Sequence, residues 1–262
     1  MVNKIFKLGL IIISIIALIF ILTPILFLVF RGVFLLYDCL KEREVLFSIK
    51  LSLITSIIST VIVIAVAIPI GYSLSRLNFK FKKFISILFY IPMSMPHLIL
   101  GIALLIVCGN SITGRFLQRL GLDFIFTIKG IILAQVFVNI SFAIKMLKAS
   151  VDKVSKKLEF IGRTLGCDRF KNFIYIVIPL IKKEVLVAFM IVWSKALGEF
   201  GAVMLLVGIT SMKTELLPTS IYLNVSTGNM DIAIGVATIL IIISFLIILP
   251  FEILEENANA RN

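Results

Sequence analysis

The run LSLITSIISTVIVIAVAIPIGYSL, residues 51–74, contains no charged side chain. An α-helix needs about 20 mostly apolar residues to cross the hydrocarbon core of a bilayer. Small polar residues recur in its first half at offsets of three and four, which places them on one helix face. The run therefore predicts a membrane-spanning helix with a polar stripe, and such stripes serve helix packing more often than pore lining. The stripe comprises Ser52, Thr55, Ser56, Ser59 and Thr60.

Five further apolar runs have similar lengths, at residues 8–30, 84–107, 130–147, 185–207 and 232–251. Hydrophobic residues make up 60% of the chain and charged residues 15%, whereas soluble domains have about 45–50% and about 25%. This composition excludes a soluble domain and a disordered chain. The runs are also too long, and alternate too little, for a membrane β-barrel. The sequence thus predicts an all-α membrane protein whose six transmembrane helices form one domain over residues 1–262.

The first run follows Lys4 and Lys7, as in a signal peptide. Its apolar stretch is longer than the roughly 7–15 residues of a signal peptide, and no A-x-A-like site follows it. We therefore expect an uncleaved span with a cytoplasmic N-terminus, and six spans then place the C-terminus inside too. In this orientation 17 of the 26 Lys and Arg residues are cytoplasmic, eight are outside and Lys195 lies within a span. That bias is typical of multi-pass proteins in the cell membrane.

The longest hydrophilic segment, at about residues 150–183, lies on the predicted cytoplasmic side. Within 151–165, apolar residues recur at spacings of three and four, which predicts one amphipathic helix that ends at Gly166. A second short helix is expected over 168–178, with Asp168 as its N-cap and Pro179 as its stop. Such a helix pair could lie on an anionic membrane surface or dock a cytoplasmic protein.

The glycine–proline spacing in this segment resembles the EAA loop of ABC importer permeases, whose pattern is EAA, then G-x9-I-x-L-P. Here Phe160, Ile161 and Gly162 occupy the triplet, Glu159 precedes it, and an isoleucine replaces the leucine. The resemblance implies the type I importer permease fold and a loop that couples to a separate ATPase. The residues implied in coupling are Glu159, Arg163, Leu165, Gly166, Ile176, Ile178 and Pro179.

A second stretch, WSKALGEFGA at residues 193–202, resembles the R-A-L-G-E-F-G-A stretch of the molybdate, tungstate and sulfate branch of these permeases. Ile91, Pro92, Pro96 and Gly101 resemble the entry to that branch's third span. The resemblance implies import of a tetrahedral oxyanion, with molybdate or tungstate favoured and sulfate also possible. It also implies a homodimer, two cytoplasmic ABC ATPase subunits and an extracytoplasmic binding protein.

Charges inside a span are costly and usually mark function. Lys195 and Glu199 are four residues apart, so a continuous helix would place them on one face. A pair that merely holds helices together is the simpler interpretation. Our hypothesis is that Lys195 attracts the anion and that Glu199 helps to hold a gate, each with partners on other helices. Further pathway candidates, all within the fourth or fifth run, are Asn139, Ser141, Gly198 and Gly201. Glycine there permits close helix packing, the default, or a break in the helix.

Several chemistries have no counterpart in the sequence. No G-x-x-x-x-G-K-[ST] motif is present to hold ATP phosphates, so ATP and Mg²⁺ are expected on the partner chain and no cofactor on this one. No cluster of residues suggests a metal site or a catalytic centre, and the single histidine, His97, is expected to be structural. The basic charges mostly flank spans and do not indicate nucleic-acid binding. The alternative function is an ion-coupled secondary transporter that uses Lys195 and Glu199 as its coupling pair.

Overall fold

The computed structural model describes residues 2–109 and 111–259, and all regular elements in this part of the chain are helices. Arg261, counted above among the cytoplasmic cations, lies outside the described residues. The elements are α1 (Val2–Val33), α2 (Leu36–Cys39), α3 (Arg43–Arg76), α4 (Lys82–Ser94), α5 (His97–Cys108), α6 (Ile112–Arg119), α7 (Ile128–Lys153), α8 (Lys156–Thr164), α9 (Arg169–Asn172), the π-helical η1 (Phe173–Val177), α10 (Ile178–Leu180), α11 (Lys182–Leu197), α12 (Gly201–Val207), α13 (Leu217–Ser226) and α14 (Met230–Asn259).

Each of the six predicted runs corresponds to helix, but two of the spans are broken. The helices α1, α3, α7 and α14 are each long and apolar enough to cross a bilayer alone. The pairs α4–α5 and α11–α12 qualify only together, with bends of 110° and 55°. Pro96 accounts for the first break, because the residue before a proline is pushed out of the helical region, and Met95 has φ −92° and ψ 143°. The second break falls after Leu197, where Gly198 ends α11.

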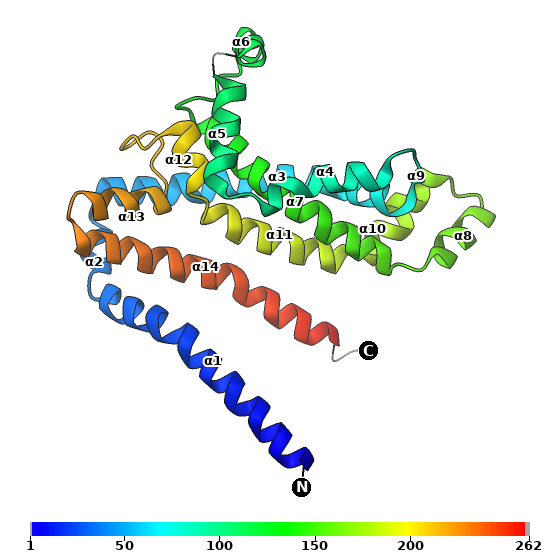
Figure 1. Cartoon of the computed structure of the whole chain (residues 1–262), viewed down its shortest axis with the longest axis horizontal. Helices are drawn as coiled ribbons and strands as arrows, with labels where there is room; N and C mark the ends of the chain where they lie inside the picture. The colour runs from blue at the N-terminus through cyan, green and yellow to red at the C-terminus, as the bar shows by residue number, and fades with distance from the viewer. Residues whose placement is uncertain (1, 110, 260–262) are drawn as a thin grey trace.

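The centre of the molecule is the pair α3 and α7, which run side by side (Figure 1). Gly71 of α3 approaches α7 so closely that a Cβ atom there would lie 3.0 Å from the backbone nitrogen of Lys148. An apolar core joins α3 and α7 to α11, and its buried members include Val63, Ala67, Ile144, Leu147, Ala188 and Val192. This core positions the broken fifth span against the two central helices.

The polar stripe of α3 faces this interior, where its five residues are each no more than 1% exposed. Ser56 Oγ accepts a hydrogen bond from the indole nitrogen of Trp193 on α11 at 3.0 Å. Ser52 Oγ accepts one from the backbone nitrogen of Leu217, the first residue of α13, at 2.8 Å. The stripe thus joins α3 to neighbouring elements, and the predicted packing role is confirmed.

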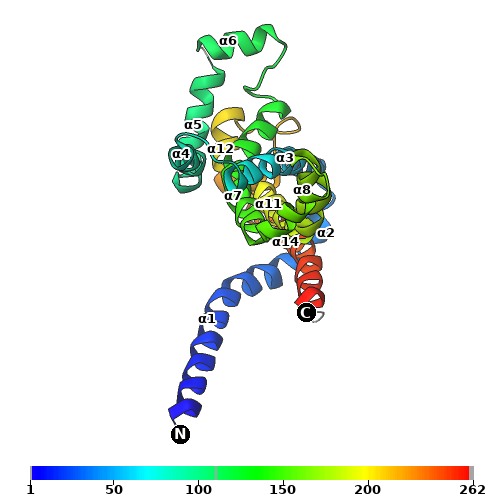
Figure 2. The ribbon, with the colours of Figure 1, turned by 90° about the vertical axis from the view of Figure 1, so that its right-hand side faces the viewer.

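Helix α1 diverges from the other helices along most of its length (Figures 1 and 2). No residue in its most apolar window is buried. It contacts the bundle at its C-terminal end, where Gly32 lies directly against Thr238 of α14. In Figure 1, α2 and α13 lie at the left-hand end of the molecule and α8 to α10 lie at the right-hand end, and the start of α1 and the end of α14 point away from the left-hand end.

The prediction of one helix over 151–165 is wrong. Helix α7 continues to Lys153, Val154 is extended, and Ser155 caps a new helix, α8. The proposed apolar face is therefore divided: Val151 is buried in the core, whereas Leu165 is 79% exposed. Side-chain capping explains the break, because the Ser155 hydroxyl accepts a hydrogen bond from the Lys157 backbone nitrogen at the start of α8. The segment between α7 and α11 consequently spans 154–181 rather than about 150–183.

The second predicted helix is present, and Asp168 is its N-cap, accepting a hydrogen bond from the Lys171 backbone nitrogen at 2.7 Å. It does not stop at Pro179, because α10 continues to Leu180. A π-helical turn, Phe173–Val177, directly precedes the proline. Proline normally clashes with the carbonyl four residues earlier, and the wider π-helical turn changes the position of those carbonyls.

Candidate functional site

The two broken spans meet at Glu199 and His97. Glu199 lies in the break between α11 and α12, with its side chain only 1% exposed, and His97 is the first residue of α5. The Nδ1 atom of His97 lies 2.8 Å from a carboxylate oxygen of Glu199. The other carboxylate oxygen accepts a hydrogen bond from the backbone nitrogen of Ala202 at 3.1 Å. Glu199 therefore supplies an acceptor to the start of α12 and also ties that start to the start of α5.

Glycines allow α5 and α12 to pack closely around this pair, which we call the His97–Glu199 joint. A Cβ atom at Gly101 would lie 2.9 Å from the Cα of Ala202, and one at Gly201 would lie 3.3 Å from the Leu98 backbone nitrogen. A Cβ atom at Gly198 would meet only the carbonyl oxygens of Ser194 and Lys195, at 3.8 and 3.9 Å, and Gly198 ends α11. Both interpretations of the glycines therefore hold, since Gly201 serves close packing and Gly198 stands at a break.

Lys195 and Glu199 form no ion pair with each other, and each has a partner on another helix, as our hypothesis expects. Helix α11 ends at Leu197, between the two residues, and no ion pair within 4.0 Å joins them among the described residues. Lys195 is exposed, and its Nζ atom lies 5.3 Å from the centre of the Phe142 ring on α7. A cation over a ring face is held electrostatically while it stays accessible. Lys195 is therefore available to other groups on the molecular surface.

The two polar candidates in the fourth run, Asn139 and Ser141, are each 1% exposed. The Nδ2 atom of Asn139 donates to the Gln135 carbonyl of the same helix at 2.8 Å, and Gln135 Nε2 donates to the Ala196 carbonyl on α11 at 3.0 Å. Gln135 Oε1, Asn139 Oδ1 and Ser141 Oγ are buried without a partner among the described residues. Because unpaired polar atoms are costly in an apolar interior, this part of α7 is a polar seam rather than ordinary core.

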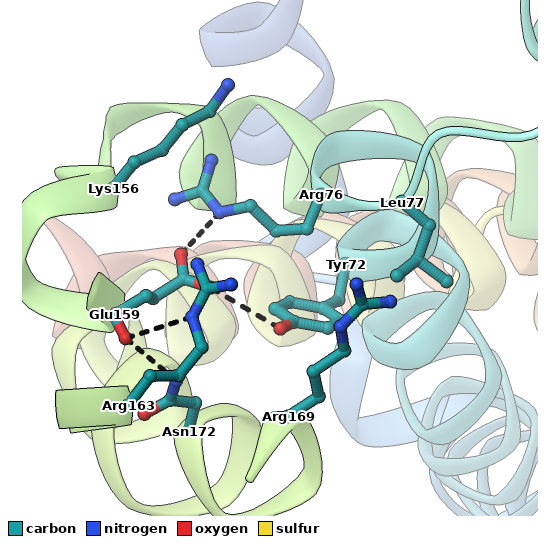
Figure 3. A pocket seen from close by; sticks show the side chains of 8 residues that line it. All are labelled: Tyr72, Arg76, Leu77, Lys156, Glu159, Arg163, Arg169 and Asn172. Atoms are coloured by element: carbon teal, nitrogen blue, oxygen red, sulfur yellow. Dashed lines mark hydrogen bonds and ion pairs between the residues drawn. The ribbon is translucent and has the colours of Figure 1, made fainter. Parts of the chain in front are cut away.

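At the other end of the molecule, Glu159 anchors α8 to α3 (Figure 3). Its carboxylate pairs with the Nε atom of Arg76, and both side chains are 7% exposed. The Tyr72 hydroxyl donates to the other carboxylate oxygen at 3.4 Å. Arg76 also donates to the carbonyls of Val151 and Val154, at 2.9 and 2.6 Å, where α7 ends. The Arg76 guanidinium thus connects the ends of α3 and α7 to α8.

Further contacts fix α8 against the helix that follows it. The Asn172 side chain donates to the Glu159 carbonyl at 2.9 Å. A Cβ atom at Gly162 would overlap the side chains of Asn172 and Ile176. Glycine in the third position of the unusual triplet is therefore a packing requirement. Arg163, one turn after Glu159, reaches the Glu159 carbonyl only at 3.5 Å and is otherwise exposed.

The remaining coupling candidates lie around an exposed turn and an exposed apolar face. Gly166 has a φ of +89° and would place a Cβ atom in open space, so its backbone conformation, not crowding, favours glycine. Leu158, Ile161 and Leu165 are exposed by 43%, 52% and 79%. Ile176 of η1 and Ile178 of α10 are half-buried, and Pro179 is exposed. No group of three or more His, Cys, Asp or Glu residues that could hold a metal occurs in the described part of the chain.

The sequence did not identify His97, Gln135 or Arg76 as site residues. A histidine directly after a proline, Pro96, marks the start of a helix and could have indicated a role at a break. Gln135 is a lone amide in an apolar run, which needs a partner in a membrane. Arg76 is an ordinary span-flanking cation by its pattern, and only the fold places it beside Glu159.

Comparison with known proteins decides the family. Residues 67–261 match the family described as "Binding-protein-dependent transport system inner membrane component". The chain belongs to this family. The probable transport system permease NifC of Clostridium pasteurianum is 32% identical over 212 residues, which cover 80% of this chain and 74% of the relative. The molybdate/tungstate transport system permease WtpB of Methanocaldococcus jannaschii is 28% identical, with 78% and 80% covered.

Two further similarities agree with that assignment. A probable sulfate transport system permease, cysT of Prototheca wickerhamii, is 30% identical, with 77% of this chain and 78% of the relative covered. A crystal structure of a bacterial ABC transporter that imports the polysaccharide alginate shares the fold, with a TM-score of 0.77 at 18% identity over 95% of this chain and 94% of the other. This chain is thus an ABC importer permease subunit of the molybdate, tungstate and sulfate branch, and a transport component rather than an enzyme.

The His97–Glu199 joint is testable by a double-mutant cycle on thermal unfolding in detergent. We expect His97→Ala and Glu199→Gln to destabilise the permease non-additively, with a coupling of about 0.5–3 kcal/mol, because the two side chains contact each other. Arg163→Ala, at the far end of the molecule, is the control partner for His97→Ala and should be additive with it. Additivity of His97→Ala and Glu199→Gln would show that the contact between the two side chains contributes no stability.

Proposed function

We propose that this permease, paired with a second copy of itself, forms the path by which a tetrahedral oxyanion crosses the cytoplasmic membrane. Molybdate or tungstate is the favoured ion, and sulfate is the next candidate. The observation that carries this proposal is the similarity, over more than three quarters of the chain, to permeases named for molybdate, tungstate and sulfate transport. A separate ATPase, which binds ATP and Mg²⁺, supplies the energy.

The exposed apolar face of α8 is the proposed docking site for that ATPase. Leu158, Ile161 and Leu165 follow one another at spacings of three and four, so they lie on one side of the helix. They are exposed at an end of the molecule from which the α8–α10 region projects. Apolar side chains gathered on a projection are typical of a surface that a partner covers. The Glu159 carboxylate points the other way, toward Arg76, so its proposed contribution to coupling is to hold α8 in place.

The proposed orientation places the α8–α10 region in the cytoplasm with both ends of the chain. Two observations support it. The start of α1 and the end of α14 point away from the end that carries α2 and α13, as α8–α10 do. The Lys and Arg bias favours the side of α8–α10 as the inner one, which is also where the ATPase finds ATP. The opposite end, with α2 and α13, then faces the extracytoplasmic binding protein that the family description implies.

The proposed homodimer is supported by the shape of the protomer. Helix α1 diverges from the bundle and leaves its apolar surface uncovered within one copy. The interior of one protomer is filled by the packing of α3, α7 and α11. A path between two copies would therefore be lined by surface residues, and Lys195 is an exposed cation within a span. In this arrangement Lys195 attracts the oxyanion, and the His97–Glu199 joint and its glycines hold the broken spans that border the path.

In the proposed cycle, ATP binding closes the two ATPase subunits and draws the two α8–α10 regions together. Because Arg76 connects α8 to the ends of α3 and α7, that movement reaches the central helices. The spans then change from inward-open to outward-open and accept the ion from the binding protein. The polar seam at Gln135, Asn139 and Ser141 gives the interior unpaired hydrogen-bonding groups that can exchange partners during this change.

The alternative, an ion-coupled secondary transporter, requires Lys195 and Glu199 to act as a pair. The break after Leu197 separates them, and Glu199 is paired with His97 instead. The projecting α8–α10 region would also have no use without a partner. The structure therefore gives this alternative no specific support.

The direct test is uptake of labelled molybdate into proteoliposomes that contain the permease, its ATPase and its binding protein. We expect uptake to require ATP and to be inhibited by tungstate more strongly than by sulfate. Lys195→Ala should lower uptake by about tenfold, corresponding to about 1.4 kcal/mol, whereas Lys195→Arg should preserve it because the positive charge remains. Uptake that an ion gradient drives without the ATPase, or that Lys195→Ala leaves unchanged, would refute the proposal or the assigned role of Lys195, respectively.

Coupling through the α8–α9 turn is tested by Gly166→Val. A β-branched residue is strained at φ +89°, so the turn should change shape, and permease-stimulated ATP hydrolysis should fall severalfold. Gly228→Val is the matched control, because Gly228 has φ +83° and open space around it but lies between α13 and α14. Equal stimulation of the ATPase by the Gly166→Val protein and the Gly228→Val protein would contradict the docking role.

A further inference from the structure

A cavity of about 130 Å³ lies where α8 and α9 meet the end of α3 (Figure 3). A single water needs only about 10–15 Å³ by the same kind of measure, so the cavity can hold a polyatomic group. Its lining is mostly polar and charged: Tyr72, Arg76, Leu77, Lys156, Glu159, Arg163, Arg169 and Asn172. We call it the Arg76 pocket.

The charges of the Arg76 pocket do not balance. Four cationic side chains line it, and Glu159 is the one carboxylate in the lining. That carboxylate is already paired with Arg76, whose other nitrogens donate to Ser75 and to two backbone carbonyls. Lys156, Arg163 and Arg169 have no carboxylate within 4.0 Å among the described residues. The pocket thus carries an excess of three positive charges.

The guanidinium groups of Arg76, Arg163 and Arg169 come from α3, α8 and α9 and gather around Glu159 and Tyr72 in Figure 3. Like charges held this close repel one another, and an anion between them removes that cost. A guanidinium offers a planar set of donors that matches the oxygens of a phosphate-like group. Arg163 and Arg169 are exposed, so their donors are accessible from solution.

The Arg76 pocket is separate from the proposed docking face. Lys156, Glu159 and Arg163 are spaced by three and four residues and share the side of α8 that faces α3. Leu158 and Ile161 are only one or two residues away from these positions along the chain, and residues so spaced do not share a helix face. They therefore lie on the opposite side of the same helix. A partner on the apolar side would therefore leave the Arg76 pocket unfilled, and a ligand there would not compete with that contact.

We propose that the Arg76 pocket binds a phosphate-type tetrahedral oxyanion group, either a free anion or the headgroup phosphate of an anionic phospholipid. Bound there, the group bridges Arg163 of α8 and Arg169 of α9 beside Arg76 of α3, and it stiffens the connection between α8 and the central helices. This binding depends on the pocket residues alone and does not require the permease to transport any particular ion.

The test is direct binding of inorganic phosphate to the purified full-length permease in detergent, by calorimetry at constant ionic strength. A second arm measures retention of phosphatidylglycerol, against phosphatidylcholine, by native mass spectrometry after extraction from mixed vesicles. The test variant is Arg163→Gln/Arg169→Gln. Each arginine supplies charge-assisted hydrogen bonds, so affinity should fall at least about tenfold for each one removed.

The matched control is Lys157→Gln/Lys171→Gln, which removes the same charge from the same two helices outside the lining of the pocket. It should bind like the original protein. Binding of inorganic phosphate would show that the group bound in the Arg76 pocket is a free anion. Retention of phosphatidylglycerol would show that it is a lipid headgroup. The single variants Arg163→Gln and Arg169→Gln should each weaken binding if the double variant fails to fold. No binding in either arm, or equal loss in the control and the test variant, would overturn the proposal.

Discussion

A chain in a bilayer must satisfy its backbone hydrogen-bonding groups within the protein, because lipid offers none. This permease nevertheless interrupts its helices at the third and fifth spans and at the end of α7. At two of these interruptions a charged side chain supplies the missing partner. Glu199 accepts the Ala202 backbone N–H at the start of α12, and Arg76 donates to the Val151 and Val154 carbonyls at the end of α7.

Each of these two side chains also pairs with a side chain on another helix, and so it fixes that helix in place. Glu199 is paired with His97, so the starts of α5 and α12 are fixed to each other. Arg76 is paired with Glu159, so α8 is fixed to α3. The orientation of α8 follows from that pair: its charged side faces α3 and the Arg76 pocket, and its apolar side faces outward. One ion pair thus determines which side of α8 faces α3 and which side faces outward.

The sequence predicted the features of this structure that depend on local properties, and it missed those that depend on contacts between distant segments. The six apolar runs and the Asp168 cap were predictable, because hydrophobicity and capping are local properties. The break before Ser155 was missed because the apolar spacing of 151–165 continues across it, and the contacts of Arg76 that end α7 are not visible in the pattern. The spacing of Lys195 and Glu199 assumed a continuous helix, and the sequence pattern did not show that Gly198 ends that helix. The partnership of His97 with Glu199 depends on contacts between distant spans.

The central claim is that the two charged side chains stabilise two separate sets of helices. Hydrogen–deuterium exchange of the permease in nanodiscs tests it most directly. The account predicts that Glu199→Ala increases exchange in peptides from α5 and α12 and leaves α8 unchanged, whereas Arg76→Gln increases exchange in peptides over 151–164 and leaves α12 unchanged. Unchanged exchange in the helices next to each substitution, or the same pattern for both variants, would contradict it.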